Sequence, residues 1–93
     1  MELSLRFFAV FREAVGEKER TRTYDGGRTT VGTVLADLEG EYEGLAGELL
    51  DDGAVRDQLS VLKNGQDVVH IDGVDTELTE GDTLSVFPPV AGG

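Results

Sequence analysis

One amphipathic helix surrounded by short strands leaves few folds open to this 93-residue chain. Apolar residues recur at helical spacing between positions 29 and 42, at Val31, Val34, Leu35, Leu38 and Tyr42. Thr30 precedes this stripe, and its hydroxyl can accept a backbone N–H of the first helical turn. The sequence therefore predicts a helix within residues 29–42, with Thr30 as its N-cap.

Alternating segments before the helix predict two strands. In residues 2–8 the side chains of Leu3, Leu5 and Phe7 fall on one face, and Phe8 falls on the opposite face with the polar residues. Residues 19–24 place β-prone residues among charges, a pattern typical of an edge strand. Polar residues around Gly16 predict a turn that joins the two strands into a hairpin.

Segments after the helix predict the remaining strands. Residues 59–71 contain two apolar runs around Asn64-Gly65, a pair that favours a tight type I′ hairpin turn. Within residues 78–87, Gly81-Asp82 leads into a predicted last strand with Leu84 and Val86 toward the core and Ser85 and Phe87 on the other face. Residues 43–57 look irregular or briefly helical, and Leu45, Leu49 and Leu50 are available to cover the core.

The resulting order of elements is β-β-α-β-β-β. Packing the one helix on one face of a mixed sheet is the economical way to bury these apolar stripes. The sequence therefore predicts an α+β chain with the β-grasp, or ubiquitin-like, arrangement. We expect residues 1–87 to form the domain and residues 88–93 to form a flexible, extended tail.

Charge and composition exclude several classes of function. The formal net charge of −11 would be repelled by phosphate backbones, so we expect no nucleic-acid partner. The acidity fits either a salt-rich cytoplasm, which we favour, or a partner with a basic docking surface. No long apolar run is present, so we expect a cytoplasmic monomer without a membrane segment.

Residue types that carry catalysis or bind metal are scarce. The chain has no cysteine and one histidine, His70, and nothing in the sequence fixes the geometry of its carboxylates. We therefore expect no metal site, no bound cofactor and no catalytic role for the chain itself.

The segment FPPVAGG, residues 87–93, carries the clearest functional signal. Pro88 and Pro89 end the strand ladder and project the chain as a stiff, extended segment. Gly92 and Gly93 lack Cβ atoms, so a carboxylate on Gly93 is sterically bare and can enter a narrow channel. Such a carboxylate suits adenylation by an enzyme that uses ATP. A lysine amine would then give an isopeptide bond, and a sulfur donor would give a thiocarboxylate.

Apolar side chains near this tail predict a docking patch. Phe8 and Phe87 fall on the sheet face opposite the core, and Leu62 joins them there. We expect the patch to continue along the tail through Pro88, Pro89 and Val90. The two lysines, Lys63 in the predicted hairpin and Lys18, are candidate isopeptide acceptors for the tail of a second copy.

Five segments together resemble the MoaD/ThiS sulfur-carrier family, in particular the small subunit of molybdopterin synthase. They are FFAVFREAVG (7–16), TTVGTVLADL (29–38), LKNGQDV (62–68), LTEGDTLSVF (78–87) and PPVAGG (88–93). The acidic, lysine-poor composition resembles the haloarchaeal branch, the small archaeal ubiquitin-like modifier proteins. One departure is Lys63, where many relatives carry an apolar residue.

The resemblance implies a β-grasp fold and activation by an ATP-dependent, ubiquitin-activating-like enzyme at Gly93. It implies a protein modifier joined to target lysines, or alternatively a sulfur carrier for molybdopterin biosynthesis or tRNA thiolation. The large subunit of molybdopterin synthase is then a candidate partner. A third reading from another class is an interaction module that is never conjugated and whose terminal glycines are incidental.

Overall fold

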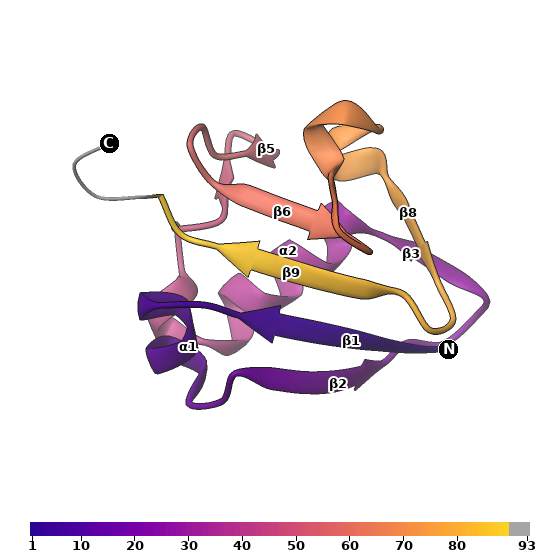
Figure 1. Cartoon of the computed structure of the whole chain (residues 1–93), viewed down its shortest axis with the longest axis horizontal. Coiled ribbons are helices and arrows are strands. Elements are labelled where there is room, and N and C mark those ends of the chain that lie inside the picture. The colour runs from indigo at the N-terminus through magenta and orange to yellow at the C-terminus, as the bar shows by residue number, and fades with distance from the viewer. Residues whose placement is uncertain (90–93) are drawn as a thin grey trace.

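A five-stranded mixed sheet is the centre of the molecule. The computed structural model describes residues 1–89, and within them the strands of this sheet lie in the order β2-β1-β9-β6-β7 (Figure 1). The central strands β1 and β9 run parallel, and the other neighbouring strands run antiparallel. The strand bounds are β1 Glu2–Phe7, β2 Glu19–Thr23, β6 Ser60–Lys63, β7 Gln66–Asp67 and β9 Thr83–Phe87.

Smaller elements surround this sheet. Two short antiparallel pairs are formed by β3 with β8 and by β4 with β5. Their bounds are β3 Arg28–Thr30, β8 Glu77–Thr79, β4 Leu50–Asp51 and β5 Ala54–Val55. The helices are α1 Val10–Val15, α2 Val31–Glu41, and the 3-10 turns η1 Glu43–Leu45, η2 Val68–His70 and η3 Gly73–Asp75. None of the helices in residues 1–89 has the length and apolarity needed to cross a membrane.

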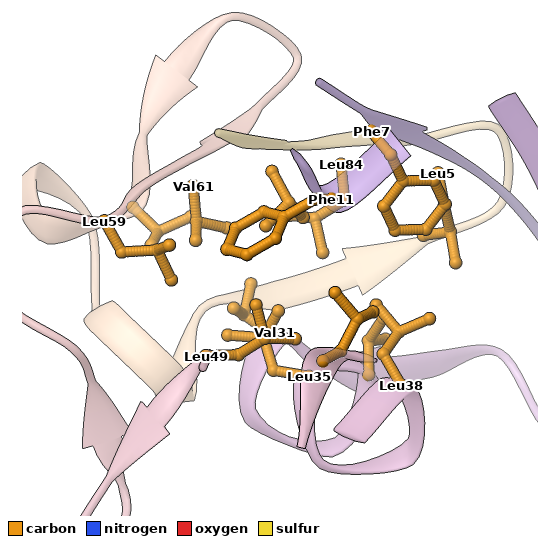
Figure 2. Packing of buried hydrophobic residues seen from close by; sticks show 14 of the residues in the cluster. Leu5, Phe7, Phe11, Val31, Leu35, Leu38, Leu49, Leu59, Val61 and Leu84 are labelled. Carbon is orange, nitrogen blue, oxygen red and sulfur yellow. The ribbon is translucent and has the colours of Figure 1, made fainter. Parts of the chain in front are cut away.

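The core lies between the sheet and helix α2. Side chains from β1, β6 and β9 point toward side chains of α2 (Figure 2). Burying each such side chain stabilises the fold by about 1.5–3 kcal/mol. The buried apolar residues are Leu3, Leu5, Phe7, Phe11, Val31, Val34, Leu35, Leu38, Leu45, Leu49, Leu59, Val61, Val68, Leu78, Leu84 and Val86. The β-grasp arrangement with one main helix is thus confirmed, as are the predicted inward faces of the first and last strands.

Two predicted local signals are confirmed. The hydroxyl of Thr30 accepts the backbone N–H of Thr33 at 3.3 Å, as expected of an N-cap. Asn64 and Gly65 both have positive φ, 50° and 89°, which a type I′ turn requires. The strand after this turn is shorter than predicted, because the Asp67 carboxylate accepts the N–H of Val69 and starts the 3-10 turn η2.

The segment between the first two strands differs from the prediction. The turn expected there contains the short helix α1, which begins after Ala9 and ends at Gly16 in the left-handed conformation. Ala9 has a φ of 54°, so the chain bends sharply away from β1 and directs Phe11 into the core. Helix α1 was missed because six residues show too little periodicity to distinguish a helix from a loop.

Residues 43–57 are anchored to the main helix by one carboxylate. Glu39 of α2 accepts the backbone N–H groups of Leu49 and Leu50 at 2.8 and 2.9 Å. Leu45 and Leu49 are fully buried and Leu50 is partly buried, as the sequence predicts for leucines that cover the core. The β4–β5 hairpin that follows was not predicted.

Candidate functional site

Two aromatic rings stack on the face of the sheet away from α2. The parallel register pairs Phe7 with Val86, so the next residues, Phe8 and Phe87, come together where β1 and β9 end. Their ring centroids lie 4.0 Å apart and their planes differ by 11°. Both rings are partly buried. The predicted position of these two residues opposite the core is therefore confirmed.

A groove of about 690 Å³, which we call the tail groove, opens beside the stacked rings. It is lined by Phe8, Ala9, Val10, Gln58, Ser60, Leu62, Phe87, Pro88 and Pro89. The structure thus brings together five of the residues predicted to form a docking patch, namely Phe8, Leu62, Phe87, Pro88 and Pro89. Val90, the sixth, lies outside the described residues.

Val10 also lines this groove and was not predicted from the sequence. The residue is 59% exposed, which is unusual for a large apolar residue. The bend at Ala9 explains this exposure, because it starts α1 with Phe11 turned inward and leaves Val10 outside. A signal was available in the sequence, since three apolar residues follow Phe8 and a single buried face cannot accommodate all of them.

Two arginines flank the wall of the groove. The guanidinium carbons of Arg6 and Arg12 lie 5.7 and 6.0 Å from the centroid of the Phe8 ring, within cation–π distance. Arg6 also pairs with Glu19 on the neighbouring strand at 3.6 Å. Arg12 donates from Nε to the carbonyl oxygen of Phe7 at 3.4 Å. The apolar groove therefore has a cationic border.

The two candidate acceptor lysines lie at opposite ends of the sheet. Lys18 precedes β2 and its carbonyl accepts the N–H of Phe7, so it lies at the end where the groove opens. Lys63 pairs with Leu84 near the start of β9, at the far end. Lys18 is exposed, whereas the side chain of Lys63 is 28% exposed and its Nζ lies 3.9 Å from Asp82.

Asp82 is held in its ionised form by its neighbours. Partial burial opposes ionisation, but hydrogen bonds from Thr79 and Asn64 and the charge of Lys63 outweigh it and lower the pKa of Asp82 below 3.8. The N–H of Thr79 donates at 2.8 Å and the side-chain amide of Asn64 at 2.9 Å. Lys63 is therefore part of a structural network as well as a candidate acceptor.

The predicted transfer residues, Gly92 and Gly93, lie outside the described residues. Pro88 and Pro89 are the last residues described, and both line the tail groove. The path to Gly93 therefore starts at this groove. Within residues 1–89, no three His, Cys, Asp or Glu side chains are grouped as metal ligands. His70 lies exposed in the 3-10 turn η2.

Comparison with known proteins identifies the family. The model of the ThiS family matches residues 5–93. Small archaeal modifier protein 3 of Haloferax volcanii is 59% identical over the full length of both chains. The sulfur carrier protein CysO of Mycobacterium tuberculosis is 34% identical, over 69% of this chain and 72% of its own.

A solved structure supports the same assignment. The solution structure of a Haloferax volcanii protein superimposes with a TM-score of 0.88 at 60% identity, covering 100% of this chain and 87% of that one. The fold, the resemblance of the five segments and the full-length match agree with one another. The chain therefore belongs to the ThiS family.

Proposed function

We propose that this protein is a ubiquitin-like modifier, joined through the carboxylate of Gly93 to lysines of target proteins after ATP-dependent adenylation. The observation that carries the proposal is the tail groove, which lies where the chain leaves the sheet toward Gly93. The full-length similarity to a protein named as a small archaeal modifier supports it. The need for ATP favours the cytoplasm as the compartment.

The proposed chemistry has two steps. A carboxylate oxygen of Gly93 attacks the α-phosphate of ATP, and pyrophosphate leaves, which forms an acyl adenylate. A target lysine amine then attacks the acyl carbon, AMP leaves, and the amine loses a proton as the isopeptide bond forms. Glycine suits the reacting position because no Cβ hinders approach to the carbonyl. The chain is a substrate in both steps, and the activating enzyme supplies the ATP site.

Sulfur transfer is the second candidate function. The same acyl adenylate, attacked by a sulfide-level sulfur nucleophile, would release AMP and leave a thiocarboxylate on Gly93. The similarity to a protein named as a sulfur carrier favours this alternative. Acceptors of the sulfur would be a molybdopterin precursor on the large subunit of molybdopterin synthase, or a tRNA base on its thiolating enzyme. One activation step serves both functions.

The tail groove is the proposed docking site of the activating enzyme. An enzyme that holds Gly93 in its active site must also cover the surface from which the tail departs. Phe8, Leu62 and Phe87 provide an apolar surface there, and partly buried aromatic residues are frequent hot spots of protein interfaces. Pro88 and Pro89 line the same groove, so docking and tail delivery share one surface.

The experiment that tests the activation step is ATP–pyrophosphate exchange with the purified activating enzyme of the source organism. We expect exchange with the wild-type chain, and none after deletion of Gly92-Gly93 or with Gly93→Val. Gly27→Val is the matched control, because Gly27 has an ordinary φ and a Cβ there would meet no atom within 4 Å. Exchange by the truncated chain at the wild-type rate would refute the mechanism.

Mass spectrometry of the source cells separates the two candidate functions. Peptides carrying a tail remnant on a lysine would establish protein modification and identify the targets. A replacement of oxygen by sulfur at the terminus, without such branches, would establish sulfur transfer alone. An unmodified carboxylate under every growth condition would contradict both and favour an interaction module.

A further inference from the structure

The cations of this chain are mostly neutralised by neighbouring carboxylates. Five of the eight basic residues form ion pairs within residues 1–89. The pairs are Arg6–Glu19, Arg20–Glu17, Arg22–Glu41, Arg28–Glu77 and Lys63–Asp82. Arg12 has no carboxylate partner among the described residues, although acidic residues outnumber basic ones by 19 to 8.

Arg12 is held in place at the border of the tail groove. Its Nε donates to the carbonyl of Phe7, and its guanidinium lies 6.0 Å from the ring centroid of Phe8. Phe8 is in turn fixed by its stack on Phe87. Because the side chain is exposed, its remaining N–H donors can reach a partner that fills the groove. Such a partner would displace water from the guanidinium, so the cation requires a new acceptor.

We propose that Arg12 receives a carboxylate from the protein that docks in the tail groove, so that the groove selects an apolar segment with an acidic residue beside it. The inference rests on the proposed function, because it identifies the activating enzyme as the occupant. The planar guanidinium suits a carboxylate, with which it can form two parallel hydrogen bonds.

The net charge of the chain makes this contact informative about orientation. A surface with a charge of −11 repels an acidic segment almost everywhere. Arg12, Lys18 and Arg56 have no carboxylate partner among residues 1–89. Of these three cations, Arg12 lies against the Phe8 ring that lines the groove, so an acidic segment beside the groove is attracted to Arg12. The apolar groove and the cation together define two points of attachment and fix the direction of the docked partner.

The test is calorimetric titration of the full chain with its activating enzyme, alongside ATP–pyrophosphate exchange. We expect Arg12→Gln to raise the dissociation constant about tenfold while the exchange rate at saturation stays unchanged. Arg12→Lys, which keeps the charge, should weaken binding less. Arg28→Gln is the matched control because Arg28 pairs with Glu77 far from the groove, and it should change binding less than twofold.

Salt dependence separates a direct contact from a supporting role for Phe8. If Arg12 meets a carboxylate, its advantage over Gln shrinks as KCl rises from about 0.2 to about 2 M. A different result would overturn the proposal: wild type binds more tightly than Arg12→Gln by the same factor at every salt concentration, and Arg12→Lys binds no better than Arg12→Gln. Arg12 would then only support the Phe8 ring. Equal dissociation constants for Arg12→Gln and Arg28→Gln would also overturn the proposal. If the wild-type chain supports no ATP–pyrophosphate exchange by the activating enzyme, the proposed function is refuted, and the inference with it.

Discussion

Asp82 connects the β6–β7 hairpin to the start of β9. Its carboxylate accepts hydrogen bonds from Thr79 and Asn64, and it pairs with Lys63. Asn64 adds a second connection, because its side-chain oxygen accepts the N–H of Thr83 at 2.9 Å. The turn residue that the sequence identifies for its backbone conformation therefore also joins two strands through its side chain.

This network predicts a pH-dependent loss of stability. Because the pKa of Asp82 is lowered in the folded chain, its stabilising effect is fully present above 3.8 and is lost as the pH falls through the lower folded value. Asp82→Asn should therefore lower the thermal midpoint at neutral pH, and the difference from wild type should shrink as the pH falls below 3.8. Asp51→Asn, at an exposed position in β4, is the control. A difference that does not shrink in acid would contradict the assignment.

At the scale of elements, the two glycines of helix α2 differ in their surroundings. A Cβ on Gly40 would meet no atom within 4 Å. A Cβ on Gly32 would lie 3.1 Å from the Cβ of Val74 and 3.2 Å from its carbonyl oxygen. Gly40 therefore only weakens the helix, whereas Gly32 allows η3 to pack closely against it.

This contrast predicts different effects of one substitution at two positions. Gly40→Ala should raise the free energy of unfolding by about 0.5–1 kcal/mol, because alanine restricts the unfolded chain and favours the helix. Gly32→Ala should give no such gain, since the contact with Val74 offsets it. Urea unfolding of the two variants measures both values. A gain of equal size at Gly32 would show that η3 moves aside without cost.

The elements that could be predicted from sequence are those specified by neighbouring residues. The alternation of Leu3, Leu5 and Phe7 defines a strand face, and Thr30 defines a helix start. Both signals depend on neighbouring residues and not on tertiary contacts. The pairing of β3 with β8 joins distant segments of three residues each, and such short segments carry no period of their own. The bonds from Glu39 to the Leu49–Leu50 backbone likewise depend on tertiary placement.

The same distinction applies to the candidate site. Phe8, Leu62 and Phe87 could be assigned to it because strand alternation shows which face each one occupies. Arg12 could not, because its place beside Phe8 depends on the bend at Ala9 and on helix α1. Sequence patterns thus indicate the apolar part of the groove, and the fold adds the charged part.

The charge of the whole molecule predicts how salt affects its stability. The net charge of −11 destabilises the compact state through self-repulsion, and salt screens this repulsion. Screening also weakens the surface ion pairs, but exposed pairs each contribute less than about 1 kcal/mol. We expect the thermal midpoint to rise between about 0.1 M and about 1 M KCl, as the Debye length falls from about 10 to about 3 Å.

Measurement near the isoelectric point provides the control for this salt effect. At pH 4.2 the chain carries almost no net charge, so the rise should disappear there. Thermal unfolding followed by circular dichroism, at pH 7 and at pH 4.2, makes the comparison. A rise of the same size at pH 4.2 would mean that salt acts through preferential exclusion from the surface and not through charge.

The parallel pairing of β1 with β9 links the order of synthesis to the presentation of the tail. Leu5 lies beside Leu84, so β1, the first strand to be synthesised, cannot form the centre of the sheet until β9, the last strand, has been synthesised. Phe8 likewise receives its stacking partner only when Phe87 arrives. A nascent chain that ends before Phe87 lacks three of the nine residues that line the groove, namely Phe87, Pro88 and Pro89. Under the proposed function, a chain must therefore be translated through β9 and folded before it presents the complete docking surface, which would keep unfinished chains from being activated.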